Sequence, residues 1–460
     1  MDGFVLRACK DLAASGASLA AITVPAPVLA IERAARADLA GPILRWDSPA
    51  PDRDGRAWSF AGFGEAACVD GSGDARFDEL RRGADELFAR LVERRHPDVE
   101  GAPPPRLYGG VAFRPEPARI APWTAFRDAS FALPRWLYGT NGERAFLRVV
   151  MRAGEPLALD PEAIEATLAG FAAIASAAEG RDAPTEASIE RTSPEVWGAM
   201  IGDALARIRA HELEKVVPMV LCRVSAETSL DAAAAIARIG ALYPECVRFA
   251  FQRGPAVFLG ASPERLVQKT GLAVEADALA GSAPRRGEGD PRDARAAAGL
   301  LESDKDRREH RVVVDAVLAA LTPIARELRV PGAPVVRTLR NVHHLWTPIA
   351  ATLARPMHVL DLVRALHPTP AVCGTPREAA IRWIAAHEPA TRGWYAGAVG
   401  WFDAAGDGAF SVAIRSGVLA HREAWLYAGA GIVEGSDASL EYAETRVKQT
   451  AMLTALGLAS

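Results

Sequence analysis

Cysteine is scarce in this chain, and neither sign of charge is in excess. The five cysteines are scattered over 460 residues, their number is odd, and none belongs to a CxxC pair. This usage argues against a disulfide framework or a cysteine-ligated zinc ion and is typical of a reducing compartment. The formal net charge is −4, and no block of basic residues marks a nucleic-acid surface. We therefore expect a cytoplasmic protein without a nucleic-acid partner.

A long hydrophobic run is also lacking. Residues 12–31, LAASGASLAAITVPAPVLAI, carry no charge, but Ser, Gly, Thr and two prolines dilute them, and Asp2 and Asp11 precede them. The stretch is therefore a poor membrane span, and its acidic flank is wrong for a secretory signal. We expect the end of a helix followed by a strand there, and no membrane partner.

Several motifs of nucleotide, zinc and serine chemistry are missing. The chain has no Walker A loop, no GxGxxG that opens a helix and no HEXXH. GASPE (260–264) is not a nucleophile elbow, because Glu264 stands where the last glycine belongs. His343 and His344 are adjacent, so one strand cannot aim both at a single metal. The sequence thus argues against the enzyme classes that depend on these motifs.

Short apolar strands and amphipathic helices follow one another irregularly along the chain. We predict strands at 106–115, 144–154, 215–224, 246–252, 256–260, 395–403, 410–420 and 424–431. We predict helices at 77–95, from Ser193 and Pro194 onward, and at 292–326, 359–366, 376–387 and 438–456. This order is not a regular βαβ repeat, so it favours antiparallel or mixed sheets with helices packed outside. The polar stretch 181–191 predicts a linker, which divides the chain into an N-terminal portion (1–190) and a motif-rich region (192–457).

Residues 302–311, ESDKDRREHR, run directly into a stretch of three valines. Glu309 therefore lies at the edge of a predicted core, where a carboxylate is costly unless it is paired or bound to a metal. From spacing alone, two interpretations are equally open. Glu309 is either a metal ligand or the partner of Lys305 or of a neighbouring arginine.

The last predicted helix carries Glu441, Glu444 and Lys448 on one face. It follows a glycine-rich turn, AGAGIVEG (428–435), whose small residues let a ligand approach the backbone. Glu444 and Glu309 could together hold a hard divalent cation such as Mg²⁺, which prefers oxygen ligands. The alternative is an exposed face with salt bridges.

Two more polar residues stand at strand ends. Lys215 begins the strand 215–224, where a lysine usually extends to solvent but a desolvated one can act as a base. Glu264 follows the strand 256–260 in a turn of small residues. It is either an ordinary solvated turn residue or a proton donor at the strand edge.

Ten short motifs occur in a characteristic order: KVV, GASPE, LAGSAPRRG, ESDKDRREH, HHLWTP, LHPTPAVCGTP, YAGAVGWFD, AIRSGVL, AGAGIVEGS and YAETRVK. Together they resemble the chorismate-utilising enzyme family, which includes isochorismate synthases, salicylate synthases and the synthase subunits for anthranilate and aminodeoxychorismate. The resemblance covers roughly residues 192–457. It implies an α/β (α+β) fold, in which one large domain of two stacked antiparallel sheets is surrounded by helices and chorismate binds between the sheets.

The resemblance also implies a role for each matched residue. Lys215 matches the general base of the water-using members, and Glu264 matches the general acid. Glu309 and Glu444 match the carboxylates that hold Mg²⁺, with Glu441 acting nearby through water. The substrate-binding matches are Gly281 and Ser282 at the ring hydroxyl, Tyr395 and Arg415 at the enolpyruvyl carboxylate, Gly429, Gly431 and Lys448 at the ring carboxylate, and His344 beside the substrate.

Within the family, the resemblance favours isochorismate synthase, which converts chorismate by water attack at C2 and loss of the C4 hydroxyl in a Mg²⁺-dependent reaction. The ammonia-using synthases generally lack a lysine at the position of Lys215, so we expect no glutamine amidotransferase partner. Salicylate synthases, which also eliminate pyruvate, tend to carry Thr where this chain has Ala371. They are the first alternative, ahead of an anthranilate or aminodeoxychorismate synthase component. The product could feed menaquinone, siderophore or salicylate synthesis.

The chain departs from the family pattern directly after KVV, where Pro218 and Met219 follow. Proline has no N–H to donate, so Pro218 should cost a ladder hydrogen bond unless it lies at an edge or a bulge.

Overall fold

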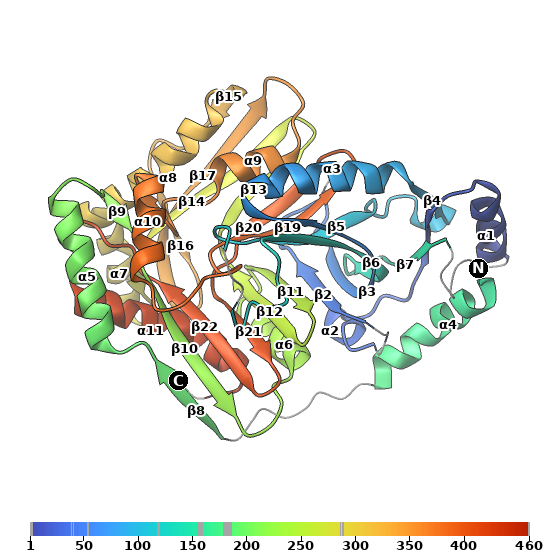
Figure 1. Ribbon diagram of the computed structural model, residues 1–460, viewed down its shortest axis with the longest axis horizontal. Coiled ribbons are helices and arrows are strands. Elements are labelled where there is room, and N and C mark those ends of the chain that lie inside the picture. The colour runs from blue at the N-terminus through green and yellow to red at the C-terminus, as the bar shows by residue number, and fades with distance from the viewer. Residues whose placement is uncertain are drawn as a thin grey trace.

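The computed structural model describes residues 3–458, apart from 38, 40, 53–54, 117–119, 154–159, 178–185, 286 and 288. Strands form the centre of the molecule, and helices lie around them (Figure 1). Among the described strands, β1 (Leu19–Pro25) and β4 (Leu91–Arg95) form the one parallel pair. None of the helices in these ranges is long and apolar enough to cross a membrane.

The sheet has two arms. The first follows the order β8–β10–β22–β21–β12–β11–β2–β3–β6–β7–β1–β4. Its other strands are β2 (Ile43–Asp47), β3 (Ser59–Gly71), β6 (Ala129–Thr140), β7 (Ala145–Arg152), β8 (Ala187–Arg191), β10 (Met219–Ala226), β11 (Val247–Arg253), β12 (Ala256–Ser262), β21 (Ser416–Ala420) and β22 (Glu423–Gly429).

The second arm follows the order β6–β5–β19–β20–β13–β14–β17, and β15 and β16 pair along the far edge of β17. Its strands are β5 (Arg106–Val111), β13 (Arg265–Thr270), β14 (Ala273–Pro284), β15 (Ala325–Arg329), β16 (Val335–Thr338), β17 (Val342–Leu353), β19 (Ala398–Asp403) and β20 (Gly408–Val412). A separate two-stranded ladder joins β9 (Lys215–Val216) to β18 (Gly374–Thr375).

The two arms meet in the long strands β3 and β6. Residues 129–132 of β6 pair with β5, whereas residues 136–140 pair with β7. Between these segments the β3–β6 register shifts next to the pair Glu65–Pro134. Because Pro134 has no N–H to donate, the ladder is irregular at the point where the arms diverge.

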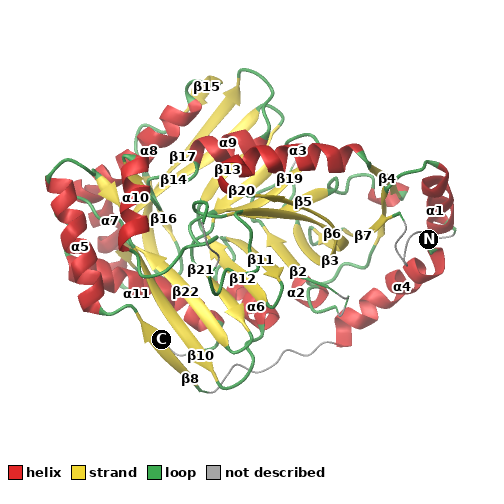
Figure 2. Ribbon diagram, viewed as in Figure 1, coloured by secondary structure: helices red, strands yellow, loops and turns green. Residues whose placement is uncertain are grey.

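Helices cover the outer faces of both arms (Figure 2). In the second arm, α8 packs on β14 and β17; in the first, α11 packs on β22 and against α5 and α6. The helices are α1 (Phe4–Ala14), α2 (Ile31–Ala34), α3 (Arg76–Ala89), α4 (Pro161–Ala177), α5 (Pro194–Arg209), α6 (Ala232–Leu242), α7 (Pro291–Glu302), α8 (Asp304–Leu321), α9 (Val359–Leu366), α10 (Arg377–His387) and α11 (Ala438–Ala455), with 3₁₀ turns at Gly73–Ala75 and Pro97–Val99.

Aromatic side chains form the core between the arms. The ring of Tyr395, which precedes β19, stacks on that of Tyr427 in β22 with centroids 5.0 Å apart. Trp394 contacts Phe258 of β12 edge-on at 6.2 Å. These rings belong to one continuous buried cluster. The predicted fold class, an antiparallel sheet architecture surrounded by helices, is confirmed, with the two sheets joined into one hydrogen-bonded network through β3 and β6.

The N-terminal expectation and the start of α5 are confirmed. Residues 12–31 contain the end of α1 and the strand β1. The side chain of Ser193 caps α5 by accepting a hydrogen bond from the Val196 N–H at 3.3 Å.

Other predicted elements are divided in the structure. The predicted helix 292–326 is two helices, because Ser303 is extended (ψ 113°) and caps α8. The predicted strand 410–420 breaks before Arg415, whose φ is +52°. The predicted helix 77–95 ends at Ala89, and residues 91–95 form β4.

The predicted linker 181–191 is wrong for its second half. Residues 187–191 form the strand β8, which pairs with residues 222–226 of β10. Residues 181–185 lie outside the described part of the chain. A polar composition misled the prediction, because β8 is an edge strand and alternates half-buried and exposed residues.

Candidate active site

A pocket opens between the two arms, with about 680 Å³ of space free of protein atoms including its mouth. Its walls come from β14, β17, β22, α8, α11 and the loops around residues 371 and 395. Eleven of the thirteen predicted site residues line it: Glu264, Gly281, Ser282, Glu309, His344, Tyr395, Arg415, Gly429, Gly431, Glu444 and Lys448. The structure therefore brings together side chains that are far apart in the sequence.

Lys215 lies directly behind this lining and is fully buried. Its Nζ is 2.9 Å from Oε1 of Glu309, so the two side chains form a buried ion pair. Gly431 makes this pair possible, since a Cβ there would lie 2.2 Å from Glu309 Oε1 and 3.1 Å from Lys215 Cε. The expectation that a lysine at a strand start extends to solvent does not hold here.

Burial and Lys215 act in opposite directions on Glu309. Burial alone raises its pKa, but the charge and hydrogen bond of Lys215, together with the charges of Lys448 and Lys305, outweigh burial and lower the pKa below its usual value. Glu309 is therefore an ionised carboxylate at neutral pH. Among the described residues, neither Lys305 nor an arginine is its ion-pair partner, in contrast to one of the two interpretations that the spacing left open.

Glu264 is in the opposite protonation state. It follows β12, is 2% exposed, and its Oε1 has no hydrogen-bond partner among the described residues. Burial raises its pKa to about 8, with a further rise from Asp277 and an opposing effect of Lys215. At neutral pH Glu264 is therefore mostly a neutral carboxylic acid that can donate a proton.

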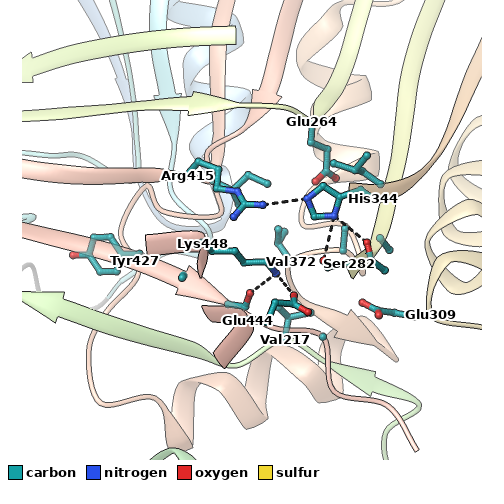
Figure 3. A pocket seen from close by; sticks show the side chains of 18 of the residues that line it. Val217, Glu264, Ser282, Glu309, His344, Val372, Arg415, Tyr427, Glu444 and Lys448 are labelled. Atoms are coloured by element: carbon teal, nitrogen blue, oxygen red, sulfur yellow. Dashed lines mark hydrogen bonds and ion pairs between the residues drawn. The ribbon is translucent and has the colours of Figure 1, made fainter. Parts of the chain in front are cut away.

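His344 links two parts of the pocket (Figure 3). Its Nδ1 lies 2.9 Å from the Gly281 carbonyl, which only accepts, so Nδ1 carries the proton. Its Nε2 then accepts a hydrogen bond from Arg415 Nη2 at 3.1 Å. Burial, with Arg415 and Lys448 nearby, holds the pKa of His344 well below its usual range. The imidazole is neutral and orients Arg415.

Arg415 carries free donors toward the pocket. Its Nη1 has no hydrogen-bond partner in the described part of the chain. Its φ of +52° lies in the left-handed region, which costs a non-glycine residue about 1–3 kcal/mol. Tyr395 lines the pocket beside it. A guanidinium with an unpaired Nη1, held on a strained backbone, is suited to bidentate contact with a carboxylate.

The three predicted metal ligands are each paired with a lysine. Glu309 pairs with Lys215, Glu444 with Lys448 at 2.6 Å, and Glu441 with Lys305 at 2.5 Å. Lys448 also donates to the Gly429 carbonyl at 2.8 Å. The alternative interpretation of α11, an exposed face with salt bridges, is therefore only partly correct: the salt bridges are present, but Glu441 is buried.

These carboxylates fit a hard cation by donor type, since Glu309 and Glu444 both line the pocket and Mg²⁺ prefers oxygen ligands. Burial raises the pKa of Glu441, and the nearby charges of Glu444 and Glu309 raise it further. A bound cation would relieve that repulsion. Within the described ranges, however, no three acidic, His or Cys side chains stand close enough to form a ready-made metal cluster.

Sequence analysis did not single out Arg392, which also lines the pocket, or its partner Glu388. Both are 3% exposed at the side chain although they lie in the loop HEPATRGWY. No periodic or spacing signal marks a buried ion pair in such a loop. Arg392 precedes Tyr395 by three positions, and this closeness to a predicted site residue was the one signal that could have found it.

The arrangement of two antiparallel arms around an acidic and basic pocket defines a known class of enzyme. The family described as chorismate binding enzyme matches residues 33–457, and the chain belongs to it.

Within this class the chain is most like isochorismate synthases. It is 37% identical over 420 residues to a salicylate biosynthesis isochorismate synthase of Pseudomonas aeruginosa, and the match covers 90% of this chain and 85% of that protein. It is 34% identical over 357 residues to isochorismate synthase MenF of Bacillus subtilis, with 77% and 75% covered. The solved structure of the menaquinone-specific isochorismate synthase MenF of Escherichia coli matches with a TM-score of 0.77 and 26% identity, covering 98% of this chain and 100% of that one.

Proposed function

We propose that this enzyme is an isochorismate synthase, which converts chorismate to isochorismate by attack of water at C2 and departure of the C4 hydroxyl. One observation carries the proposal. A buried amine, Lys215, and a buried carboxylic acid with a pKa of about 8, Glu264, belong to the same site. Figure 3 shows Glu264 at one end of the pocket and Glu309, the partner of Lys215, at the other.

The two groups divide the proton transfers of this isomerisation between them. Lys215, as the neutral amine, takes a proton from the water that forms the new C2–O bond. The ring double bonds shift, and Glu264 gives its proton to the C4 hydroxyl, which leaves as water. One water enters and one leaves, so no redox partner is required. Because Lys215 activates water, we also expect no glutamine amidotransferase subunit.

The remaining residues bind a dianion. Arg415, oriented by His344, presents its free Nη1 to one substrate carboxylate, and Tyr395 lies beside it. Lys448, near Gly429, adds positive charge for the other. Gly429 and Gly431 have no side chain at the pocket wall, where a Cβ on Gly429 would lie 3.1 Å from the Pro218 carbonyl oxygen and 3.2 Å from Val217 Cγ1.

Mg²⁺ is the cofactor that we infer for the site. Glu309 and Glu444 would hold it, and Glu441 would act nearby. When bound, the ion would offset the negative charge of chorismate and of the carboxylates.

Turnover of chorismate by the purified chain tests the proposal. Chorismate and Mg²⁺ are mixed with the protein, and products are separated by chromatography with and without EDTA. Isochorismate in equilibrium with chorismate, lost on chelation, is the expected result. Salicylate plus pyruvate would replace this assignment by salicylate synthase, and turnover that needs added ammonia would contradict the role of Lys215.

A further inference from the structure

The strand that carries Lys215 is interrupted two residues later. The ladder between β9 and β18 ends at Val216, and β10 begins at Met219. Pro218 lies in the gap and cannot donate a ladder hydrogen bond. The sequence predicted this loss, and the structure shows what replaces it.

Two side chains take the place of the missing strand partners. Arg392 donates from Nη2 to the carbonyl of Val217 at 2.6 Å. Glu388 accepts the N–H of Met219 on Oε1 at 2.9 Å. Arg392 and Glu388 are bonded to each other through Nε and Oε2 at 2.9 Å. The backbone on both sides of Pro218 is therefore held by this buried ion pair, in addition to the backbone hydrogen bonds from Val217 N–H to the Cys373 carbonyl and from Ala430 N–H to the Pro218 carbonyl.

The same guanidinium also holds the facing wall. Its Nη1 donates to the Val372 carbonyl at 2.7 Å, and its Cζ lies 4.3 Å from the ring centroid of Phe113. Val217 and Val372 both line the pocket. Arg392 thus ties together two backbone segments that meet at the site, one of which carries Lys215.

Arg392 and Arg415 differ in the use of their donors. Arg392 donates to two carbonyls and to both oxygens of Glu388. Within the described ranges, Arg415 donates a hydrogen bond to His344, and its Nη1 has no partner. A guanidinium whose donors are already engaged and whose charge is offset by a buried carboxylate has little left for a substrate anion. The role of Arg392 at the pocket therefore lies in the backbone carbonyls of Val217 and Val372 that it binds.

We propose that Arg392 and Glu388 are positioning residues that fix Lys215 and the wall at Val372 in place for catalysis. This inference rests on the proposed role of Lys215 as the base. A lysine has three donors on one nitrogen and cannot reproduce the planar fork that reaches Val217, Val372 and Glu388 together. The geometry of the pair, and not its charge, is what the site requires.

The test compares Arg392→Lys and Arg392→Met with matched changes at Arg148. Arg148 is also buried, pairs with Glu93 and donates to a backbone carbonyl, that of Pro103, at 2.6 Å, but it does not line the pocket. Each variant of the full chain is measured for kcat and KM with chorismate, and for the rate of backbone amide exchange at residues 215–217 and 219, since Pro218 has no amide hydrogen.

A shift of about 1 Å in a catalytic group costs on the order of 100-fold in rate. We therefore expect both Arg392 variants to lose about 10- to 100-fold in kcat with little change in KM, and Arg148→Lys to keep both values. Guanidinium added below denaturing concentrations should restore part of the kcat of Arg392→Gly. Wild-type kcat in Arg392→Lys, or an effect confined to KM, would overturn the proposal in favour of a charge that binds substrate.

Amide exchange separates this proposal from the proposed function. We expect faster exchange of the Val216, Val217 and Met219 amides in the Arg392 variants and in Glu388→Ala, but not in Arg148→Met. If the wild-type chain fails to turn over chorismate, the proposed function fails, and exchange at these residues still decides whether the pair holds the strand. Unchanged exchange in both Arg392 variants would refute the positioning role.

Discussion

Lys215 Nζ and Glu309 Oε1 lie 2.9 Å apart at the back of the pocket, on elements separated by more than ninety positions. Lys215 is fully buried, and the Glu309 side chain is 11% exposed. Removing one partner of a buried pair leaves the other charge uncompensated. The pair is thus both a stability element and the centre of the proposed chemistry.

Glu309→Gln should lower the free energy of unfolding by about 3–5 kcal/mol in metal-free buffer, because it leaves Lys215 buried without a counter-charge. Urea unfolding followed by fluorescence measures this. Lys215→Met combined with Glu309→Gln should recover much of the loss, since no buried charge then remains. Glu212→Gln, which breaks the exposed Arg207–Glu212 pair, should leave unfolding unchanged. Equal stability of Glu309→Gln and wild type would contradict the burial argument.

Gly431→Ala should abolish most activity. The new Cβ would stand 2.2 Å from Glu309 Oε1, so the Lys215–Glu309 pair must separate. Displacement of the base by about 1 Å predicts a loss on the order of 100-fold in kcat. Gly198→Ala in α5 is the control, because no atom lies within 4 Å of its added Cβ. Steady-state kinetics compare the two, and full activity in Gly431→Ala would argue that the pair is not needed.

Activity should decline as the pH rises through about 8, where Glu264 loses the proton that it must donate. Asp277 contributes to the raised pKa, so Asp277→Asn should move this alkaline limb to lower pH. The profile of log kcat against pH gives the midpoint of the alkaline limb for the wild type and for Asp277→Asn. An alkaline limb that stays in place in Asp277→Asn would show that burial alone sets the pKa of Glu264.

The same residue makes stability depend on pH with a definite sign. The folded pKa of Glu264 is raised from 4.5 to about 8, so between these values the folded chain binds more protons than the unfolded chain. The contribution of Glu264 to stability therefore falls as the pH rises through this window. Glu264→Gln should be inactive yet increasingly more stable than wild type from pH 5 to about 8. A constant difference in unfolding free energy across that window would refute the raised pKa.

Arg415→Lys should raise KM for chorismate and leave kcat less affected. Loss of one charge-assisted hydrogen bond costs about 1.5–3 kcal/mol, or roughly 10- to 100-fold in affinity. The exposed Arg446→Lys on α11 provides the control. An unchanged KM would mean that another cation holds the substrate carboxylate.

Mg²⁺ binding should depend on the two pocket carboxylates. Calorimetric titration of the metal-free chain should detect Mg²⁺, and Glu309→Gln and Glu444→Gln should each remove most of the heat. Glu423→Gln on β22, which alters the pair with Arg223 of β10 and does not line the pocket, should bind as wild type does. Undiminished binding in both pocket variants would place the metal elsewhere.

The sequence alone was enough to predict the fold class and to name many of the residues that line the candidate pocket. Family motifs at Glu264, His344 and Arg415 mark strand ends and turns, and those positions open into the same pocket. The hydrophobic periods located many of the strands and helices, although several had wrong bounds. The sequence did not predict the edge strand β8 or the break before Arg415, because neither has a distinctive composition.

Which acidic and basic side chains form ion pairs depends on the packing of elements that are far apart in the sequence. Helical spacing offers Lys305 to Glu309, yet Lys305 reaches across to Glu441 of α11, and Glu309 takes Lys215. The pair Arg392–Glu388 makes hydrogen bonds to the backbone beside Pro218, where the strand ladder is interrupted. Nothing in the sequence of its loop predicts this pair. The physical reason is that ion-pair energies depend on burial and on distances of a few ångströms, which are set by packing between elements far apart in the chain.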